Sequence, residues 1–436
     1  MLRKFSGWLL AGVFVATPAH AVLQIEITQG VEGARPIAVV PFAWNVSVPA
    51  RDSVDEVIKS DLRASGLFAP IDKKDFIAWP NDSSQVRFAD WRALGAENLV
   101  VGGVQAIGSI LDVRYELLDV LRGQRMIGES YRKEPAGLRS VAHRISDRIY
   151  QALTGEQGAF STRIAYVTVM RDGAGKPAYE LQVADYDGFN PQTVVRSKQS
   201  ILSPAWSPRG DKLAYVSLEH GAAAVYIQDL QTGRRERLLD TTDQNSGPTW
   251  SPDGTKLAIV MSRGGKREIY TVSLAGRTWS RLTSAMPGTF HTEPVWSPDG
   301  GYIVYVAGLG GSQAHLYRID IDGNRSQRLS FEGKQNLKPS FSPDGKQLAM
   351  VHLDSSGYHI AVLDVTSGAF RILTPAMRGL ESPTFAPNGR MILFTEEGGA
   401  RRTLGAISAD GRVKQRLALQ EDGDVQEPAW GPFLSP

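Results

Sequence analysis

Apolar residues in the C-terminal two-thirds of the chain fall into short runs of strand length, separated by clusters of glycine, proline and aspartate. One phrase, Pro-x-Trp/Phe-Ser/Ala/Gly-Pro, recurs there every 44 to 46 residues. Its six copies begin at Pro204, Pro248, Pro294, Pro339, Pro383 and Pro428. A helical repeat of this length would need apolar residues at a spacing of 3.6 and fewer turn residues. The period therefore predicts a β-propeller with one four-stranded blade per repeat.

The repeated phrase itself predicts a hairpin between the first two strands of each blade. In residues 250–257, Pro252 fixes φ at the second turn position, Asp253 bonds its own backbone, and Gly254 accepts a positive φ. The Trp or Phe of each copy lies on the incoming strand, where its ring can fill the wedge between neighbouring sheets.

The sixth copy of the phrase is followed by only four residues, so the rest of its blade must come from elsewhere. Residues 164–167, 179–188 and 192–195 match the second, third and fourth strands of the other units. We therefore predict a six-bladed propeller over residues 161–436. Its last blade combines strands from both ends of the chain and leaves no unpaired edge.

Residues 34–160 lack the repeat and mix helical with strand periodicity, which predicts a smaller α/β domain within a mainly β protein. Residues 36–40 are typical of a buried strand, and residues 111–117 alternate and have an antiparallel partner at 124–131. We expect one helix to begin after Ser53 and end at Gly66, and a second, short one around residues 91–94.

A third helix, from residue 138 to 153, has one apolar and one basic face. Its apolar stripe is predicted to lie in the core and consists of Leu138, Val141, Ile145, Ile149 and Leu153. Its basic face is predicted to face solvent and carries Arg139, Arg144 and Arg148. The join that follows, residues 154–158, is short, so we expect the two domains to touch.

The N-terminus predicts export. Arg3 and Lys4 precede an apolar run at residues 8–16, and residues 19–21 form a small-x-small cleavage site after Ala21. The chain has no cysteine, which excludes a lipoprotein signal and a disulfide framework. We expect residues 1–21 to be a signal peptide and the mature chain to be soluble. Without them the basic residues fall from 48 to 46 and equal the 46 acidic ones, which gives no electrostatic footprint for nucleic acid or anionic lipid. We expect no direct insertion into a membrane.

Residues 22–33 predict a single strand on a flexible tether, because alternating residues are followed by Gly30 and Gly33. One interpretation is an edge strand packed on its own domain. The other is a peptide offered to a partner. The residues concerned are Val22, Leu23, Gln24, Ile25, Glu26, Ile27 and Thr28.

The sequence contains no recognisable catalytic, cofactor-binding or metal-binding motif. Gly-x-Ser-x-Gly does not occur, and the seven histidines show no metal-ligand spacing. The repeated Asp253, Asp299 and Asp344 are expected to be turn residues, because Arg209 and Asn388 fill the same slot in other copies. We therefore predict no enzymatic activity and no cofactor.

The segments before each repeated proline are expected to gather around the channel mouth on one propeller face. Their mixed polar groups, with Phe290, Leu337 and Leu380 expected to be exposed, suit a protein partner, whereas the alternative is hydrated loops without one. The candidate contact residues are Gln244, Asn245, Phe290, His291, Thr292, Glu293, Asn336, Leu337, Lys338, Leu380, Glu381 and Glu427.

Several segments carry a resemblance to a known family. They lie at residues 25–27, 35–42 (RPIAVVPF), 99–102 (LVVG), 162–167 (TRIAYV), 179–188 (YELQVADYDG) and 203–208 (SPAWSP). Together they resemble the TolB family, the periplasmic propeller proteins of the Tol-Pal envelope system. Arg209 and Asn388 depart from the repeated phrase only in turns.

The resemblance implies a non-enzymatic periplasmic monomer that binds the lipoprotein Pal through the propeller face and the C-terminal domain of TolA through residues 22–28, with room for other envelope partners. It also implies roles in outer-membrane integrity and in invagination of the outer membrane during cell division. Two other classes stay open on the residues alone. Missing catalytic motifs count against a secreted propeller hydrolase, and Phe290 as the only aromatic in the mouth segments counts against a carbohydrate- or peptidoglycan-binding module.

Overall fold

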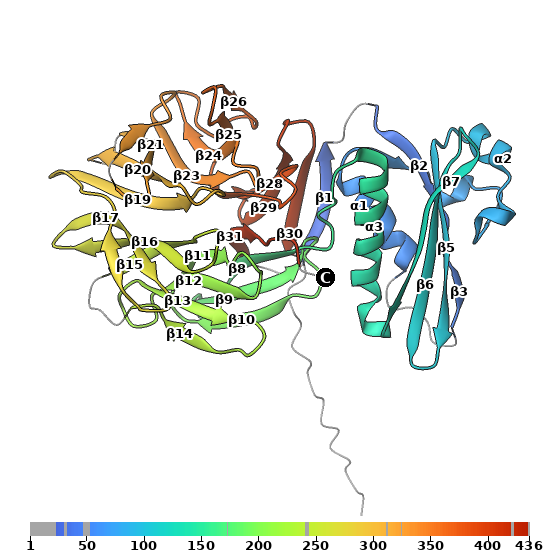
Figure 1. Ribbon diagram of the computed structural model, residues 1–436, viewed down its shortest axis with the longest axis horizontal. Coiled ribbons are helices and arrows are strands. Elements are labelled where there is room, and N and C mark those ends of the chain that lie inside the picture. Colours follow the sequence, from blue (N-terminus) through green and yellow to red (C-terminus); the bar gives the residue numbers. More distant parts are fainter. Residues whose placement is uncertain are drawn as a thin grey trace, which may run out of the picture.

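The computed structural model describes residues 23–29, 33–46, 53–171, 173–239, 244–310, 313–323, 325–419 and 423–434. Figure 1 shows a β-propeller and an α/β domain side by side, with the helix α3 (Leu138–Thr154) and the strand β1 (Leu23–Gln29) at the junction. The mainly β architecture and the order of the two domains agree with the sequence prediction.

The described residues of the propeller form six blades of antiparallel strands. Blade 1 contains β31 (Asp424–Trp430), β8 (Arg163–Arg171), β9 (Pro177–Asp185) and β10 (Gln192–Ser197). Blade 2 contains β11 (Ile201–Trp206), β12 (Lys212–Ser217), β13 (Ala224–Asp229) and β14 (Arg235–Arg237). Blade 3 contains β15 (Gln244–Trp250), β16 (Lys256–Arg263), β17 (Lys266–Ser273) and β18 (Trp279–Arg281).

The remaining three blades follow the same plan, with one added strand. Blade 4 contains β19 (Thr289–Trp296), β20 (Tyr302–Leu309), β21 (Gln313–Asp320) and β22 (Ser326–Arg328). Blade 5 contains β23 (Gln335–Phe341), β24 (Gln347–Leu353), β25 (Tyr358–Asp364) and β26 (Phe370–Ile372). Blade 6 contains β27 (Glu381–Phe385), β28 (Met391–Glu397), β29 (Arg402–Ser408) and β30 (Lys414–Leu419), and β1 pairs with β30 as a fifth strand.

Blade 1 is assembled from both ends of the propeller sequence. β31 pairs antiparallel with β8, with Trp430 opposite Ile164, and β8 pairs in turn with β9. This pairing is the one that the predicted ring closure requires.

The repeated phrase forms the expected hairpins. In blade 3, Gly254 has a φ of 71° and its N–H donates to the Ser251 carbonyl at 2.8 Å. The Asp253 carboxylate accepts from the Ser251 hydroxyl at 2.5 Å and from Thr255 N–H at 3.0 Å. Hydrogen bonds from Ser251 and Thr255 lower the pKa of Asp253 to about 2. The aspartate is a turn residue, as predicted.

The α/β domain is a mixed sheet with helices on both faces. Its strand order is β4 (Phe68–Pro70), β2 (Arg35–Val39), β5 (Asn98–Ile107), β6 (Ile110–Asp119) and β7 (Gln124–Lys133), and β3 (Ala43–Asn45) also pairs with β5. The helices are α1 (Val54–Ala64), α2 (Phe88–Ala93) and α3, with 3-10 turns η1 (Lys73–Asp75), η2 (Ser83–Gln85) and η3 (Pro135–Gly137).

Alternating residues of β2 and Val40, which follows it, divide this domain into two cores. Ile37 and Val39 pack with residues of α1 and α3, whereas Ala38 and Val40 pack with Trp91 of α2. The period-two alternation of a strand covered on both faces produces this division.

One prediction for α3 is wrong. Arg144 and Arg148 are exposed, but Arg139 is only 9% exposed and its guanidinium contacts the carboxylate of Asp187 in the propeller. The face expected to meet solvent faces the other domain at this end of the helix. The expectation that the two domains touch is met, since the Tyr186 hydroxyl also donates to the Asp61 carboxylate of α1 at 2.7 Å.

Candidate partner-binding site

Six equivalent residues, one before each repeated proline, share an unusual backbone conformation in the propeller channel. Their φ angles are 50° for Ser203, 56° for Gly247, 51° for Glu293, 53° for Lys338, 50° for Ser382 and 54° for Glu427. In each case the register of the innermost strand shifts at this point, as at a β-bulge. All six residues line a channel cavity of about 280 Å³. The sequence does not predict this ring of six residues. All of them precede a proline and five are not glycine, and both features disfavour a positive φ.

Two glutamates of this ring bond to the equivalent residue of a neighbouring blade. Glu293 accepts from Lys338 N–H at 2.6 Å, and Glu427 accepts from Ser203 N–H at 3.1 Å. The Lys338 ammonium lies 3.8 Å from Glu293 Oε1. Attraction by Glu427 raises the pKa of Lys338, against the effect of burial and with help from Glu293 and Glu381. The mouth therefore holds a fixed cation among three carboxylates.

A second cavity of about 520 Å³ continues from this charged group towards blades 5 and 6. Its lining includes Leu337, Glu381 and Arg402, and Arg402 Nη1 lies 3.3 Å from Glu381 Oε2. The lining of this cavity thus combines charged with apolar side chains, a composition that also occurs in protein–protein interfaces.

Most of the predicted mouth residues are half-buried and lie at this face. Glu293, Leu337, Lys338 and Glu381 are half-buried and line these two cavities, while Glu427 is buried but lines the channel. Phe290, His291 and Thr292 are also half-buried, but His291 lines a separate cavity of about 700 Å³ with Tyr305, and Gln244 begins β15. The Arg267 guanidinium lies 5.0 Å from the Phe290 ring, and the rings of His291 and Tyr305 are 5.1 Å apart. These contacts hold Phe290 and His291 in place before any partner binds. Burial lowers the pKa of His291, so its ring is neutral near pH 7.

Three predicted mouth residues are buried. Asn245 Oδ1 accepts from Val225 N–H at 2.7 Å and thereby joins blades 3 and 2. Asn336 Oδ1 lies 2.9 Å from His352 Nδ1, and its Nδ2 donates to the Glu332 carbonyl at 2.8 Å. Leu380, expected to be exposed, is 5% exposed and packs in the apolar cluster of blades 5 and 6. A polar residue in a mouth segment can thus hydrogen-bond to a neighbouring blade and stay buried. The sequence pattern does not distinguish such a residue from one exposed at the mouth.

The N-terminal strand docks on the propeller. β1 pairs antiparallel with β30, with Leu23 opposite Leu419 and Ile27 opposite Gln415. The interpretation as an edge strand of its own domain is therefore corrected: β1 adds to blade 6 and not to the α/β sheet that follows it in sequence. Val22 and residues 30–32 lie outside the described residues.

Helix α1 supports β30 from the side of the α/β domain. The Gln415 side chain donates to the Ala64 carbonyl at the end of α1. Gly66, at a φ of 71°, lies so close to Val413 that a Cβ there would collide with the Val413 side chain. β30, the strand on which β1 docks, is therefore held in the junction between the domains.

Both domains match models of one family. The TolB amino-terminal domain matches residues 23–126, and the TolB beta propeller domain matches residues 150–434. The chain belongs to the TolB family. A Tol-Pal system protein TolB from Nitrosococcus oceani is 48% identical over 97% of this chain and 96% of that protein. Another from Xylella fastidiosa is 44% identical over the full length of both.

A solved structure agrees with this assignment. The crystal structure of TolB from Acinetobacter baumannii is 38% identical, with a TM-score of 0.85 over 94% of this chain and 100% of that chain. This TolB-family chain is thus a component of the Tol-Pal system and not an enzyme. Within the residues that the structure describes, no helix has the length and hydropathy of a membrane span.

Proposed function

We propose that this TolB-family protein acts in the periplasm as an adaptor that binds Pal at the channel mouth and the C-terminal domain of TolA through residues 22–28. In this role it supports outer-membrane integrity and draws the outer membrane inward during cell division. The observation that carries the proposal is the presence of two separate surfaces suited to protein partners, the mouth and an edge-docked strand, in a chain of the Tol-Pal system.

The mouth suits Pal because its half-buried groups are already ordered. Phe290 is stacked under Arg267, and Glu293 and Lys338 are joined by a hydrogen bond and an ion pair. An interface that is formed before binding loses less side-chain entropy on association.

The N-terminal segment suits TolA because β1 pairs with one strand, β30, at the edge of blade 6 in the described structure. β1 is the outermost strand of blade 6 in the described structure, so it can leave without breaking another strand pair. Strand addition then transfers its main-chain hydrogen bonds to the partner.

Calorimetry with purified Pal tests the mouth site. The double variant Thr292→Val, Glu293→Gln keeps the shape of both side chains and an acceptor for Lys338 N–H, and it is expected to weaken Pal binding by about 2 kcal/mol or more. Glu134→Gln removes one exposed carboxylate from the α/β domain and serves as the matched control. Unchanged Pal affinity in a double variant that unfolds at the wild-type temperature would place the Pal site elsewhere.

A further inference from the structure

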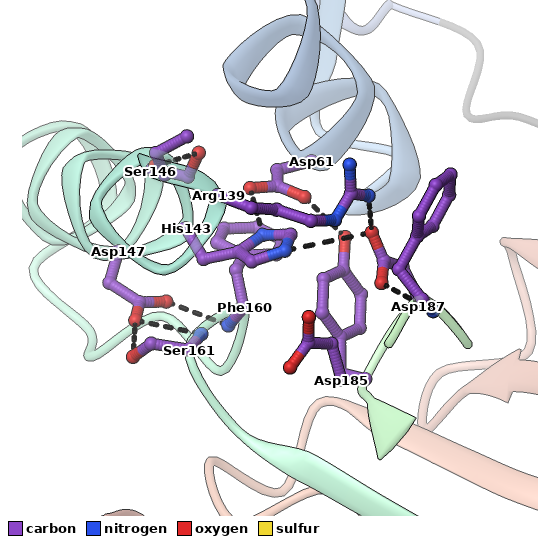
Figure 2. A network of polar contacts seen from close by, with 12 residues as sticks. Asp61, Arg139, His143, Ser146, Asp147, Phe160, Ser161, Asp185 and Asp187 are labelled. Atoms are coloured by element: carbon purple, nitrogen blue, oxygen red, sulfur yellow. Dashed lines mark hydrogen bonds and ion pairs between the residues drawn. The ribbon is translucent and has the colours of Figure 1, made fainter. Parts of the chain in front are cut away.

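A buried cluster of charged side chains joins the two domains. We call Asp61, Arg139, His143, Tyr186 and Asp187 the junction cluster. Asp61 and His143 are 1% and 2% exposed, and His143 Nδ1 lies 2.9 Å from Asp61 Oδ2. Figure 2 shows His143 between Asp61 of α1 and Asp187 of the propeller. His143 Nε2 lies 3.6 Å from Asp187 Oδ2.

The cluster connects three elements. Asp61 belongs to α1, Arg139 and His143 belong to α3, and Tyr186 and Asp187 belong to the turn after β9. The Tyr186 hydroxyl donates to Asp61, the Arg139 guanidinium contacts Asp187, and Arg139 also lies 3.5 Å from the Phe189 ring. Each helix of the junction is thereby bonded to the propeller through a charged group.

Charge balance requires a protonated histidine here. Asp61 and Asp187 supply two buried negative charges and Arg139 supplies one positive charge, so a neutral His143 would leave a net buried charge. Burial alone lowers the pKa of His143, but Asp61 and then Asp187 raise it to about 9. With His143 as imidazolium, the two carboxylates and the two cations balance.

Two further carboxyl groups face the cluster. Burial raises the pKa of Asp185, which accepts a hydrogen bond from Asn190 at 2.7 Å. Burial also raises the pKa of Asp147 to about 6, partly offset by hydrogen bonds from Ser161 and Phe160 N–H. The imidazolium of His143 in turn lowers the pKa of Asp185 against the effect of burial. The charge balance of the junction cluster itself is counted over Asp61, Arg139, His143 and Asp187.

A metal ion is not needed to complete this cluster. In the described part of the chain, one group of side chains brings ligand atoms as close together as a metal requires, and it consists of Asp61, His143 and Asp187. Their carboxylate oxygens already accept from Tyr186, His143 and Arg139, and a guanidinium in contact with Asp187 repels a second cation.

Helix α1 links the junction cluster to the N-terminal strand. Asp61 lies one turn before Ala64, whose carbonyl accepts from the Gln415 side chain of β30. Gln415 is the residue opposite Ile27 in the pairing of β30 with β1. A shift of α1 would therefore move the strand on which β1 docks.

We propose that the junction cluster is a charge-balanced contact that fixes α1 on the propeller and thereby sets how firmly β30 holds β1. Breaking the charge balance loosens β1 without any change at the channel mouth. The consequence for TolA rests on the proposed function of β1, but the contact itself is testable in the free protein.

A double-mutant cycle in the full-length mature protein, read by hydrogen exchange near neutral pH, tests this contact. His143→Gln leaves an unbalanced carboxylate, so exchange across residues 414–419 is expected to speed up by about tenfold. Adding Asp61→Asn restores the balance, and exchange is expected to return to within about threefold of wild type. Arg144→Gln, an exposed cation on the same helix, is the matched control and leaves exchange unchanged.

Two outcomes overturn the proposal. Unchanged exchange in His143→Gln, or a double variant that exchanges as fast as His143→Gln alone, would show that charge balance at this position does not control β30. If His143→Gln does not fold, nuclear magnetic resonance of ring-labelled histidine in the wild-type protein decides the point. An imidazolium near neutral pH supports the charge-balanced contact, and a neutral ring there refutes it.

Discussion

At the scale of single residues, the repeated phrase predicts its turns correctly, but it does not predict the positive φ of the six residues before the repeated prolines. The prolines, the hairpin aspartates and the turn glycines follow from local chemistry, and their positions were predicted. The left-handed conformation of Ser203, Glu293 and Lys338 was not, because it arises from the tertiary requirement of a bulge in each inner strand.

A matched pair of substitutions tests this strain. Gly247→Ala places a Cβ at a φ of 56° and is expected to lower the free energy of unfolding by about 1 kcal/mol. Ser203→Gly, at a φ of 50°, removes a Cβ from the same ring position and is expected to be neutral or stabilising. Urea unfolding measures both variants. A stabilising Gly247→Ala would contradict strain at these positions.

His143 makes the stability of the protein depend on pH in a defined direction. Its folded-state pKa of about 9 is above the ordinary value of 6.5, so its stabilising contribution is complete below pH 6.5 and is lost as pH rises through 9. The free-energy difference between wild type and His143→Gln is expected to shrink over this window by about 2 kcal/mol. A difference that stays constant from pH 6.5 to 9 would mean that His143 is not charged in the folded protein.

At the scale of elements, the N-terminal strand shows why local pattern is not enough to place a segment. The alternation of residues 22–28 predicts a strand, but its partner β30 lies almost 400 residues later in a different domain. β30 has six residues, as does β10 in blade 1, whereas the outer strands of blades 2 to 5 have three each, and β1 pairs with β30. The length of an outer strand is a weak signal, because strand ends depend on tertiary pairing.

Deleting residues 22–33 tests the assignment of the two partners to two sites. The deletion is expected to abolish binding of the TolA C-terminal domain and to leave Pal binding in place, because β1 pairs with β30 at the outer edge of blade 6, whereas residues of the innermost strands line the channel. Calorimetry with each partner measures both effects. Retained TolA binding would locate the TolA site outside the N-terminal segment, and loss of both activities would point to a misfolded protein.

At the scale of the whole molecule, the repeat period predicted the propeller and its closure, and the short linker predicted that the domains touch. The sequence does not predict how the two domains are oriented. The helical pattern therefore places Arg139 on a solvent-facing side, although its guanidinium contacts Asp187 of the propeller. A buried charge that is paired across a domain junction looks, in sequence, like any exposed charge on an amphipathic helix.

Truncation after Leu419 tests the closure of the ring. Without β31, the edge of β8 loses its partner and blade 1 loses its innermost strand. The truncated protein is expected to unfold at a lower temperature and to self-associate through the open edge. Thermal unfolding together with light scattering measures this, and a monomer as stable as the full chain would refute closure through β31.

Occupancy of the mouth is expected to change the docking of β1 if the two surfaces act as one adaptor. A coupling of about 1 to 3 kcal/mol between Pal binding and β1 docking would be sufficient for regulation. Hydrogen exchange across residues 23–28, with and without saturating Pal, measures it. Identical protection in both states would leave two independent binding sites.

Release of β1 to TolA is tested most directly by hydrogen exchange of β30 during titration with the TolA C-terminal domain. β30 pairs with β1 on one side, so removal of β1 exposes main-chain amides of residues 414–419. Faster exchange of these amides at saturating TolA, with unchanged exchange in the other blades, is the predicted result. Unchanged protection of residues 414–419 while TolA is bound would show that β1 stays docked and that TolA is held by another surface.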